Sequence, residues 1–220
     1  MLRDRDEAVS RPPPEGFPTR GIGAGVAPYS RPLLMSLNMT SDFPGFSAPS
    51  AGFEAPLQML AVCHCRIRTQ CATLLRLRSH VAMFGADDAA CTAARNVMRY
   101  FDGEARHHHE DEEQSLFPAL LESMASSDAI CLRQLVDSLT IDHRELERLW
   151  DTLKAGLVRI EARDAPSPEA GEISLLIDPY DRNIAREEQE LLPMAARLLG
   201  STDLDRIGNA MRLRRGITST

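Results

Sequence analysis

The chain has 220 residues, of which 43% are apolar and 5% aromatic, and its formal net charge is -7. This length suits one domain with an appended segment, and the apolar share is sufficient for a hydrophobic core. The negative charge provides no general attraction to nucleic acid, and no apolar run approaches the ~20 residues that a membrane-spanning helix needs. We therefore expect neither a nucleic-acid-binding protein nor a membrane protein.

The cysteines do not have the pattern of a secreted protein. There are five, an odd number, and three of them lie within one predicted helix. That arrangement is not a disulfide framework, and the N-terminal residues lack the apolar segment of a signal peptide. We expect a cytoplasmic protein with reduced thiols.

Composition divides the chain into three parts. Residues 1–53 are rich in Pro, Gly and Ser and show no sustained period, which predicts a disordered tail. Residues 54–200 are dominated by Ala, Leu, Arg and Glu, which favour helices. Residues 201–220 are expected to form a short C-terminal helix and tail.

Within residues 54–200, apolar side chains recur every three or four positions in four successive segments, the spacing of one face of a helix. The four stripes include Leu60 and Ile67, then Phe101 and Leu116, then Leu139 and Leu146, and finally Leu176 and Leu191. Long amphipathic helices with short connections predict an all-α fold, an antiparallel up-down four-helix bundle.

Each apolar stripe is interrupted near its middle by side chains that bind metals. These are His64 on the first stripe, His108 and Glu112 on the second, His143 with Glu147 on the third, and Asn183 and Glu187 on the fourth. Residues four apart lie on the same face of a helix. Because buried carboxylates are costly unless they are paired or bind a cation, these residues predict a metal site inside the bundle.

A single histidine on an apolar stripe is more often a hydrogen-bonded core residue than a ligand, so the prediction depends on the coincidence across four helices. Within the run from His107 to His109, successive side chains point about 100° apart. His108 lies on the stripe, and His107 and His109 flank it. His109 is therefore only an additional candidate.

The type of ligand narrows the choice of metal. Imidazole and carboxylate groups without thiolates suit iron or manganese better than structural zinc. Ferritin-like bundles carry Glu-x-x-His motifs with a spacing of three, whereas this chain carries His-x-x-x-Glu with a spacing of four. We therefore do not expect a ferritin-like protein.

Four motifs, in order, resemble the bacterial hemerythrin-like (HHE cation-binding) domain: "CHCRIRTQC", "HHEDEEQSLFPAL", "DHRELERLW" and "NIAREEQELLP". The resemblance covers roughly residues 55–200. It implies a non-haem di-iron centre with two iron ions in a four-helix bundle. The ligands it implies are His64, His108, Glu112, His143, Glu147 and Glu187, with Glu188 as the alternative if the fourth helix is rotated.

The chain departs from the family at Asn183. Residues 183–193 repeat the pattern of residues 108–118, yet begin with asparagine where both the repeat and the family predict histidine. An amide is a poor iron ligand, and three consequences remain open. Water or a neighbouring side chain fills the vacancy, or one iron is weakened or lost, or the bundle has no metal.

The resemblance implies a protein for oxygen or NO binding, sensing or iron handling, with O₂ or NO as the ligand. The alternative is a metal-free or mono-iron bundle that acts as an interaction module for a protein partner that the sequence does not identify. No nucleophile–base arrangement or phosphate-binding Gly-rich loop supports an enzyme that acts on an organic substrate.

Overall fold

Helices make up nearly all of the chain that the computed structural model describes, which is residues 52–123, 129–164, 168 and 170–217. All of these residues belong to one compact unit, Asp42–Thr220. The predicted disordered tail lies outside the described residues, except for Gly52 and Phe53.

The α-helices in chain order are α1 (Pro56–Phe84), α2 (Asp88–Tyr100), α3 (Arg106–Asp111), α4 (Phe117–Ser123), α5 (Ala129–Glu161), α6 (Ala170–Arg186), α7 (Leu192–Leu198) and α8 (Ser201–Arg214). Three π-helical segments separate some of them: η1 (Phe101–Ala105), η2 (Glu112–Leu116) and η3 (Glu187–Leu191). Because these segments continue the helices beside them, α2 to α4 form one long rod and α6 to α7 form another. The described residues contain no strand, and none of their helices is long and apolar enough to cross a membrane.

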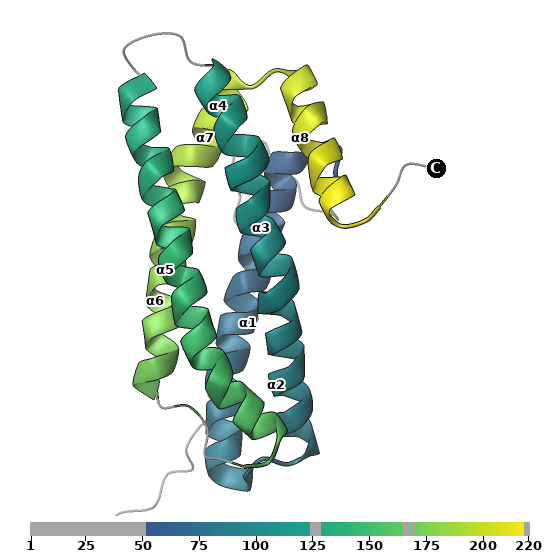
Figure 1. Cartoon of the computed structure of the whole chain (residues 1–220), viewed down its shortest axis with the longest axis vertical. Helices are drawn as coiled ribbons and strands as arrows, with labels where there is room; N and C mark the ends of the chain where they lie inside the picture. The colour runs from purple at the N-terminus through teal and green to yellow at the C-terminus, as the bar shows by residue number, and fades with distance from the viewer. Residues whose placement is uncertain (1–51, 124–128, 165–167, 169, 218–220) are drawn as a thin grey trace, which may run out of the picture. The chain divides into compact units, whose positions relative to one another are not determined.

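Four rods lie side by side and alternate in direction, as Figure 1 shows: α1, α2 to α4, α5, and α6 to α7. The contacts of α1 with α2, α2 with α5, α5 with α6 and α6 with α1 close the ring. The predicted all-α, antiparallel up-down four-helix bundle is therefore confirmed. Helix α8 lies outside this ring of four rods and packs against α1 and α3.

The turn between α1 and α2 shows why the chain reverses there. Gly85 ends α1 with a φ of 75°, a conformation that favours glycine. Asp87 then accepts a hydrogen bond from the backbone N–H of Ala90 at 2.8 Å and caps α2. His80 of α1 contacts the same carboxylate at 2.9 Å, so the turn is held from both sides.

The hydrophobic core is divided into two clusters. One contains Ile67, Leu146 and Leu176, and the other contains Leu60, Leu139 and Leu191. Between them lie the eight buried polar residues of the described chain, which are His64, His108, His109, Asp111, Glu112, His143, Asn183 and Glu187. A polar layer thus crosses the middle of an otherwise apolar bundle, where every member needs a partner.

Two of the π-helical segments follow from the repeated motif. Pro118 and Pro193 each lack the N–H that would bond the carbonyl four residues earlier. Those carbonyls belong to Gln114 and Gln189, which lie inside η2 and η3. The missing bond allows the helix to widen by one residue per turn, and such π-bulges often occur at functional sites. Because each segment begins at a glutamate of the polar layer, the motif also sets how that glutamate is presented.

Helix α8 is attached to the polar layer through Asp111, which is fully buried. The guanidinium groups of both Arg214 and Arg215 pair with its carboxylate, and the Arg215 contact measures 2.8 Å. Gly208 of α8 permits close approach, because a Cβ there would lie 1.9 Å from the carbonyl oxygen of Phe53. The C-terminal helix therefore neutralises a buried charge in the helix that carries His108 and Glu112.

This arrangement predicts that Arg215→Met lowers the free energy of unfolding by about 2–3 kcal/mol, because it leaves a buried carboxylate with one of its two partners. The control is Arg206→Met on α8, whose partners Glu122 and Asp203 are exposed. Such a surface pair is worth at most about 1 kcal/mol. Urea unfolding of both variants measures the difference, and equal losses would contradict this role of Asp111.

Candidate metal centre

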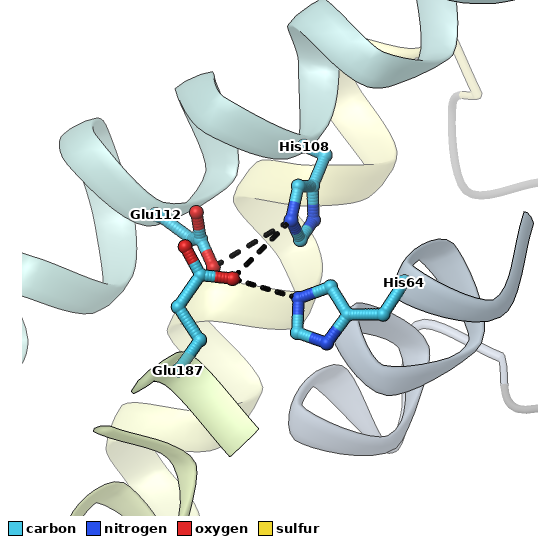
Figure 2. Close-up of side chains that lie close together, drawn as sticks. All are labelled: His64, His108, Glu112 and Glu187. Atoms are coloured by element: carbon cyan, nitrogen blue, oxygen red, sulfur yellow. Dashed lines mark ion pairs between the residues drawn. The ribbon is translucent and has the colours of Figure 1, made fainter. Parts of the chain in front are cut away.

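Four buried side chains converge inside the bundle. They are His64 from α1, His108 from α3, Glu112 at the start of η2 and Glu187 at the start of η3, and one ligand atom from each lies within 4.8 Å of the others. Figure 2 shows the two imidazoles facing the two carboxylates. The Nε2 atom of His64 lies 2.9 Å from Oε2 of Glu187, and Nε2 of His108 lies 3.7 Å from Oε1 of Glu112.

His143 of α5 faces the same two carboxylates from the other side. Its Nε2 atom lies 3.4 Å from Oε2 of Glu112 and 3.4 Å from Oε1 of Glu187. Each carboxylate therefore turns one oxygen toward His64 and His108 and the other toward His143. We call the side of His64 and His108 the first position and the side of His143 the second position. Carboxylates arranged in this way can bridge two cations.

Several of these polar atoms have no hydrogen-bond partner in the described chain. They include Nε2 of His64, both ring nitrogens of His108, both oxygens of Glu112 and Oε2 of Glu187. Leaving carboxylate and imidazole groups buried in this state is costly. A divalent cation would satisfy them together, and a donor set of imidazole nitrogen and carboxylate oxygen suits iron, manganese or zinc. The residues present therefore fit a metal ion.

The pKa values show how the site is charged without a cation. Burial and the neighbouring charge of Glu187 raise the pKa of Glu112 well above its usual range. Burial would also raise the pKa of Glu187, but the neighbouring imidazoles of His108, His143 and His64 outweigh it and hold that pKa well below its usual range. The pKa values of the two carboxylates thus shift in opposite directions, and binding of a cation at such a site is coupled to the release of protons.

The pKa values of the three imidazoles also shift in different directions. Burial lowers the pKa of His108 to about 4, so its ring is neutral and ready to bind a metal. Burial would also lower the pKa of His64, but the neighbouring carboxylates of Glu187 and Glu188 outweigh it and raise the pKa. Contacts with Glu113 and Glu187 likewise outweigh burial and raise the pKa of His143.

A second layer of carboxylates orients His64 and His143. Glu188 lies 3.1 Å from Nδ1 of His64, and Arg68 holds that carboxylate with two contacts of 2.9 and 3.0 Å. Burial would raise the pKa of Glu188, but the bonds from His64 and Arg68 bring it to about 2. A permanently charged acceptor at Nδ1 directs the Nε2 lone pair inward, as metal-binding histidines require.

The same arrangement occurs on the opposite side of the bundle. Glu113 lies 2.9 Å from Nδ1 of His143, and Arg144 pairs with the other oxygen of Glu113. Sequence reasoning missed Glu113, although the repeated Glu-Glu pairs at 112–113 and 187–188 were a signal for it. In each pair the first glutamate faces the centre, and the second holds a histidine of another helix.

Asn183 lies in the polar layer, where a second-position ligand was expected. It is buried, and its Nδ2 atom donates a hydrogen bond to Oε1 of Glu187, while its Oδ1 atom has no partner in the described chain. The amide therefore binds the carboxylate oxygen that faces the second position. The second position has His143 alone as an imidazole, whereas the first position has two.

The structure does not bring Glu147 to the cluster, contrary to what the resemblance implied. Its side chain is exposed and pairs with Arg144 at 3.1 Å. Glu147 lies one turn after His143 and on the same side of α5. Its carboxylate pairs with Arg144 instead of turning toward the cluster. His109, the additional candidate, is buried and stacks on the His143 ring with centroids 4.1 Å apart.

The sequence model of the hemerythrin HHE cation binding domain matches residues 55–195. The chain belongs to this family. The matched range contains every residue of the cluster and all four rods of the bundle, apart from the last three residues of α7. An HHE-domain protein is thus established, and its family and its buried His/Glu cluster together indicate cation binding, with iron the typical ion.

A curated relative comes from Haemophilus influenzae and is described as an uncharacterized protein. It is 28% identical over 167 residues, which cover 76% of this chain and 94% of the relative. The similarity extends over nearly the whole length of that protein.

The second-layer carboxylate at Glu188 yields a prediction for metal affinity. Glu188→Gln keeps the shape of the side chain but removes the charge that orients His64, so we expect metal affinity to fall by about 10- to 100-fold. The matched control is Glu190→Gln, an exposed glutamate in the same segment η3. Competition with a coloured chelator measures both affinities, and an unchanged value for Glu188→Gln would show that Glu188 does not act through His64.

Proposed function

We propose that this chain is a non-haem iron protein that binds O₂ or NO at a centre with two cation positions. The observation that carries the proposal is the pair of buried glutamates that each turn one oxygen to either side of the layer. Ferrous iron with an open coordination position supplies the capacity to bind a diatomic gas. The protein supplies the ligands, excludes bulk water and leaves one side of the centre short of donors.

The two positions differ in their donors. The first has His64, His108 and one oxygen from each glutamate, so it has four protein donors. The second has His143 and the other two oxygens, one of which Asn183 already occupies with a hydrogen bond. A cation at the second position would have fewer protein donors and more room for an external ligand. We therefore infer that the first ion is held firmly, and that the second position is the weaker one and binds the gas.

Iron content per folded chain is the direct test. After expression with added iron and anaerobic purification, we expect two irons per chain, one of which is removed first by a chelator because its position has a single imidazole. Elemental analysis during the chelator titration measures both losses. A folded bundle that retains no metal would contradict the proposal and favour an interaction module instead.

Restoring the missing imidazole should strengthen the second position. Asn183→His removes the amide that binds Glu187 and adds a strong donor, so the loosely held iron should become as resistant to the chelator as the first. The control is Asn96→His, which adds an imidazole at an exposed site on α2. If Asn183→His leaves the chelator titration unchanged, residue 183 does not belong to the second position.

A further inference from the structure

A cavity of about 520 Å³ lies beside the metal centre, between η1, α3, α5 and α6. Its buried end is lined by Phe101, Ala105, His109, Trp150 and Tyr180. A cavity of this size is in the range that holds small ligands. None of the four converging cluster residues lines it, so it is distinct from the metal site itself.

The buried end of the cavity is aromatic and carries no charge. The ring of Phe101 stacks on Trp150 with centroids 4.6 Å apart, and the Tyr180 ring lies 5.6 Å from Phe101. Such a surface favours small uncharged molecules over ions, because an ion would lose its hydration without gaining a counter-charge.

The charged residues of the cavity lie at its outer end, and most of their charges are paired. Lys154 contacts Asp102 at 2.7 Å, and Glu147 contacts Arg144 at 3.1 Å. Because these charges neutralise each other, they do not select for a charged ligand. The exposed position of Glu147, unexpected for a metal ligand, is explained by its place at this opening.

The π-helical segment η1 forms one wall of the cavity. Unlike η2 and η3, η1 carries no glutamate of the cluster, yet it contributes Phe101, Asp102 and Ala105 to the lining. Asp102 also accepts a hydrogen bond from Nε1 of Trp150 at 2.9 Å and so fixes the indole in the opposite wall. The bulge therefore shapes the cavity as the other two shape the metal centre.

One imidazole separates the cavity from the second position. His109 lines the cavity, is only 3% exposed, and stacks on His143 with the ring planes 6° from parallel. Neither of its ring nitrogens has a hydrogen-bond partner in the described chain. A buried imidazole in this state is unfavourable, and it would gain a partner when a ligand arrives beside it.

We propose that this cavity is the route by which a small uncharged ligand, of the size of O₂ or NO, reaches the second position. We further propose that the His109 ring is a partition, that is, the side chain that separates the cavity from the second position and that the ligand must pass. The inference rests on the proposed function and deepens it, since it states where the gas approaches and which side of the centre it meets. The position with one imidazole is also the position beside the cavity. The side with fewer protein donors is therefore the side that the route reaches.

The test uses Trp150, the one tryptophan in the chain, whose fluorescence reports directly on the cavity. Ala105→Leu should fill the buried end. We expect it to reduce both the quenching of Trp150 by dissolved O₂ in the metal-free protein and the NO association rate of the ferrous protein, each several-fold. The control is Ala155→Leu at an exposed site on α5, which should change neither.

His109→Ala should act in the opposite direction, because it removes the partition. We expect faster NO association with unchanged iron content, whereas His107→Ala, next to it but outside the lining, should leave the rate as it is. This second variant tests the route even if Ala105→Leu fails to fold, since it is expected to raise the NO association rate rather than lower it.

Three results would overturn the proposal. In the first, Ala105→Leu lowers the quenching but leaves the NO rate unchanged, so the gas enters elsewhere. In the second, His109→Ala loses an equivalent of iron, so His109 is a ligand rather than a partition. In the third, Ala105→Leu does not alter the quenching, so the cavity does not admit the gas. The quenching needs no metal, so a protein without iron would refute the proposed function while this third result remained measurable.

Discussion

Two buried glutamates, Glu112 and Glu187, face each other inside an apolar bundle, and the other features of the site follow from that burial. Both carboxylates are enclosed between two hydrophobic clusters. Without a cation, the pKa values of the two carboxylates shift in opposite directions, and the pKa values of His64 and His143 rise while that of His108 falls. A bound cation would offset the charge of both buried carboxylates. Metal binding and folding would then be coupled, since the layer that divides the core also holds the candidate metal ligands.

The repeated motif is the means by which the chain presents this pair. In both copies a glutamate begins a π-helical segment, a second glutamate follows it, and a proline six residues after the first removes a helical hydrogen bond. The first glutamate faces inward and the second orients a histidine of another helix, held in turn by an arginine. A local irregularity of the helix thus has a function, because it changes the direction in which two adjacent carboxylates point.

The two copies of the motif are not equivalent, and the difference makes the two sides of the centre unlike in their donors. His108 in the first copy corresponds to Asn183 in the second, whose amide donates a hydrogen bond to Oε1 of Glu187. That oxygen faces His143, which stacks against His109 where the aromatic cavity begins. A symmetric bundle with a symmetric site would have no preferred face for an external ligand. Here the loss of one imidazole and the position of the cavity favour the same face.

Periodicity alone predicted the four helices of the bundle, and it placed His64, His108, Glu112, His143 and Glu187 on the inward stripes. This succeeded because the helical repeat fixes which residues share a face before any packing occurs. The family followed from the motifs, since their order and spacing are properties of the chain. The pattern predicted the apolar core and its polar interruption for the same reason.

Only the tertiary structure decided which polar groups pair with which. The contact of Glu113 with His143, the turn of Glu147 toward Arg144, and the pairing of Asp111 with α8 each join residues distant in sequence or choose between competing neighbours. So does the stacking of His109 on His143. These choices depend on how each helix is rotated against the next and on which charge lies nearest, and a one-dimensional repeat contains neither. The sequence determined that a polar layer exists, and packing determined that His109 and the aromatic cavity lie beside His143.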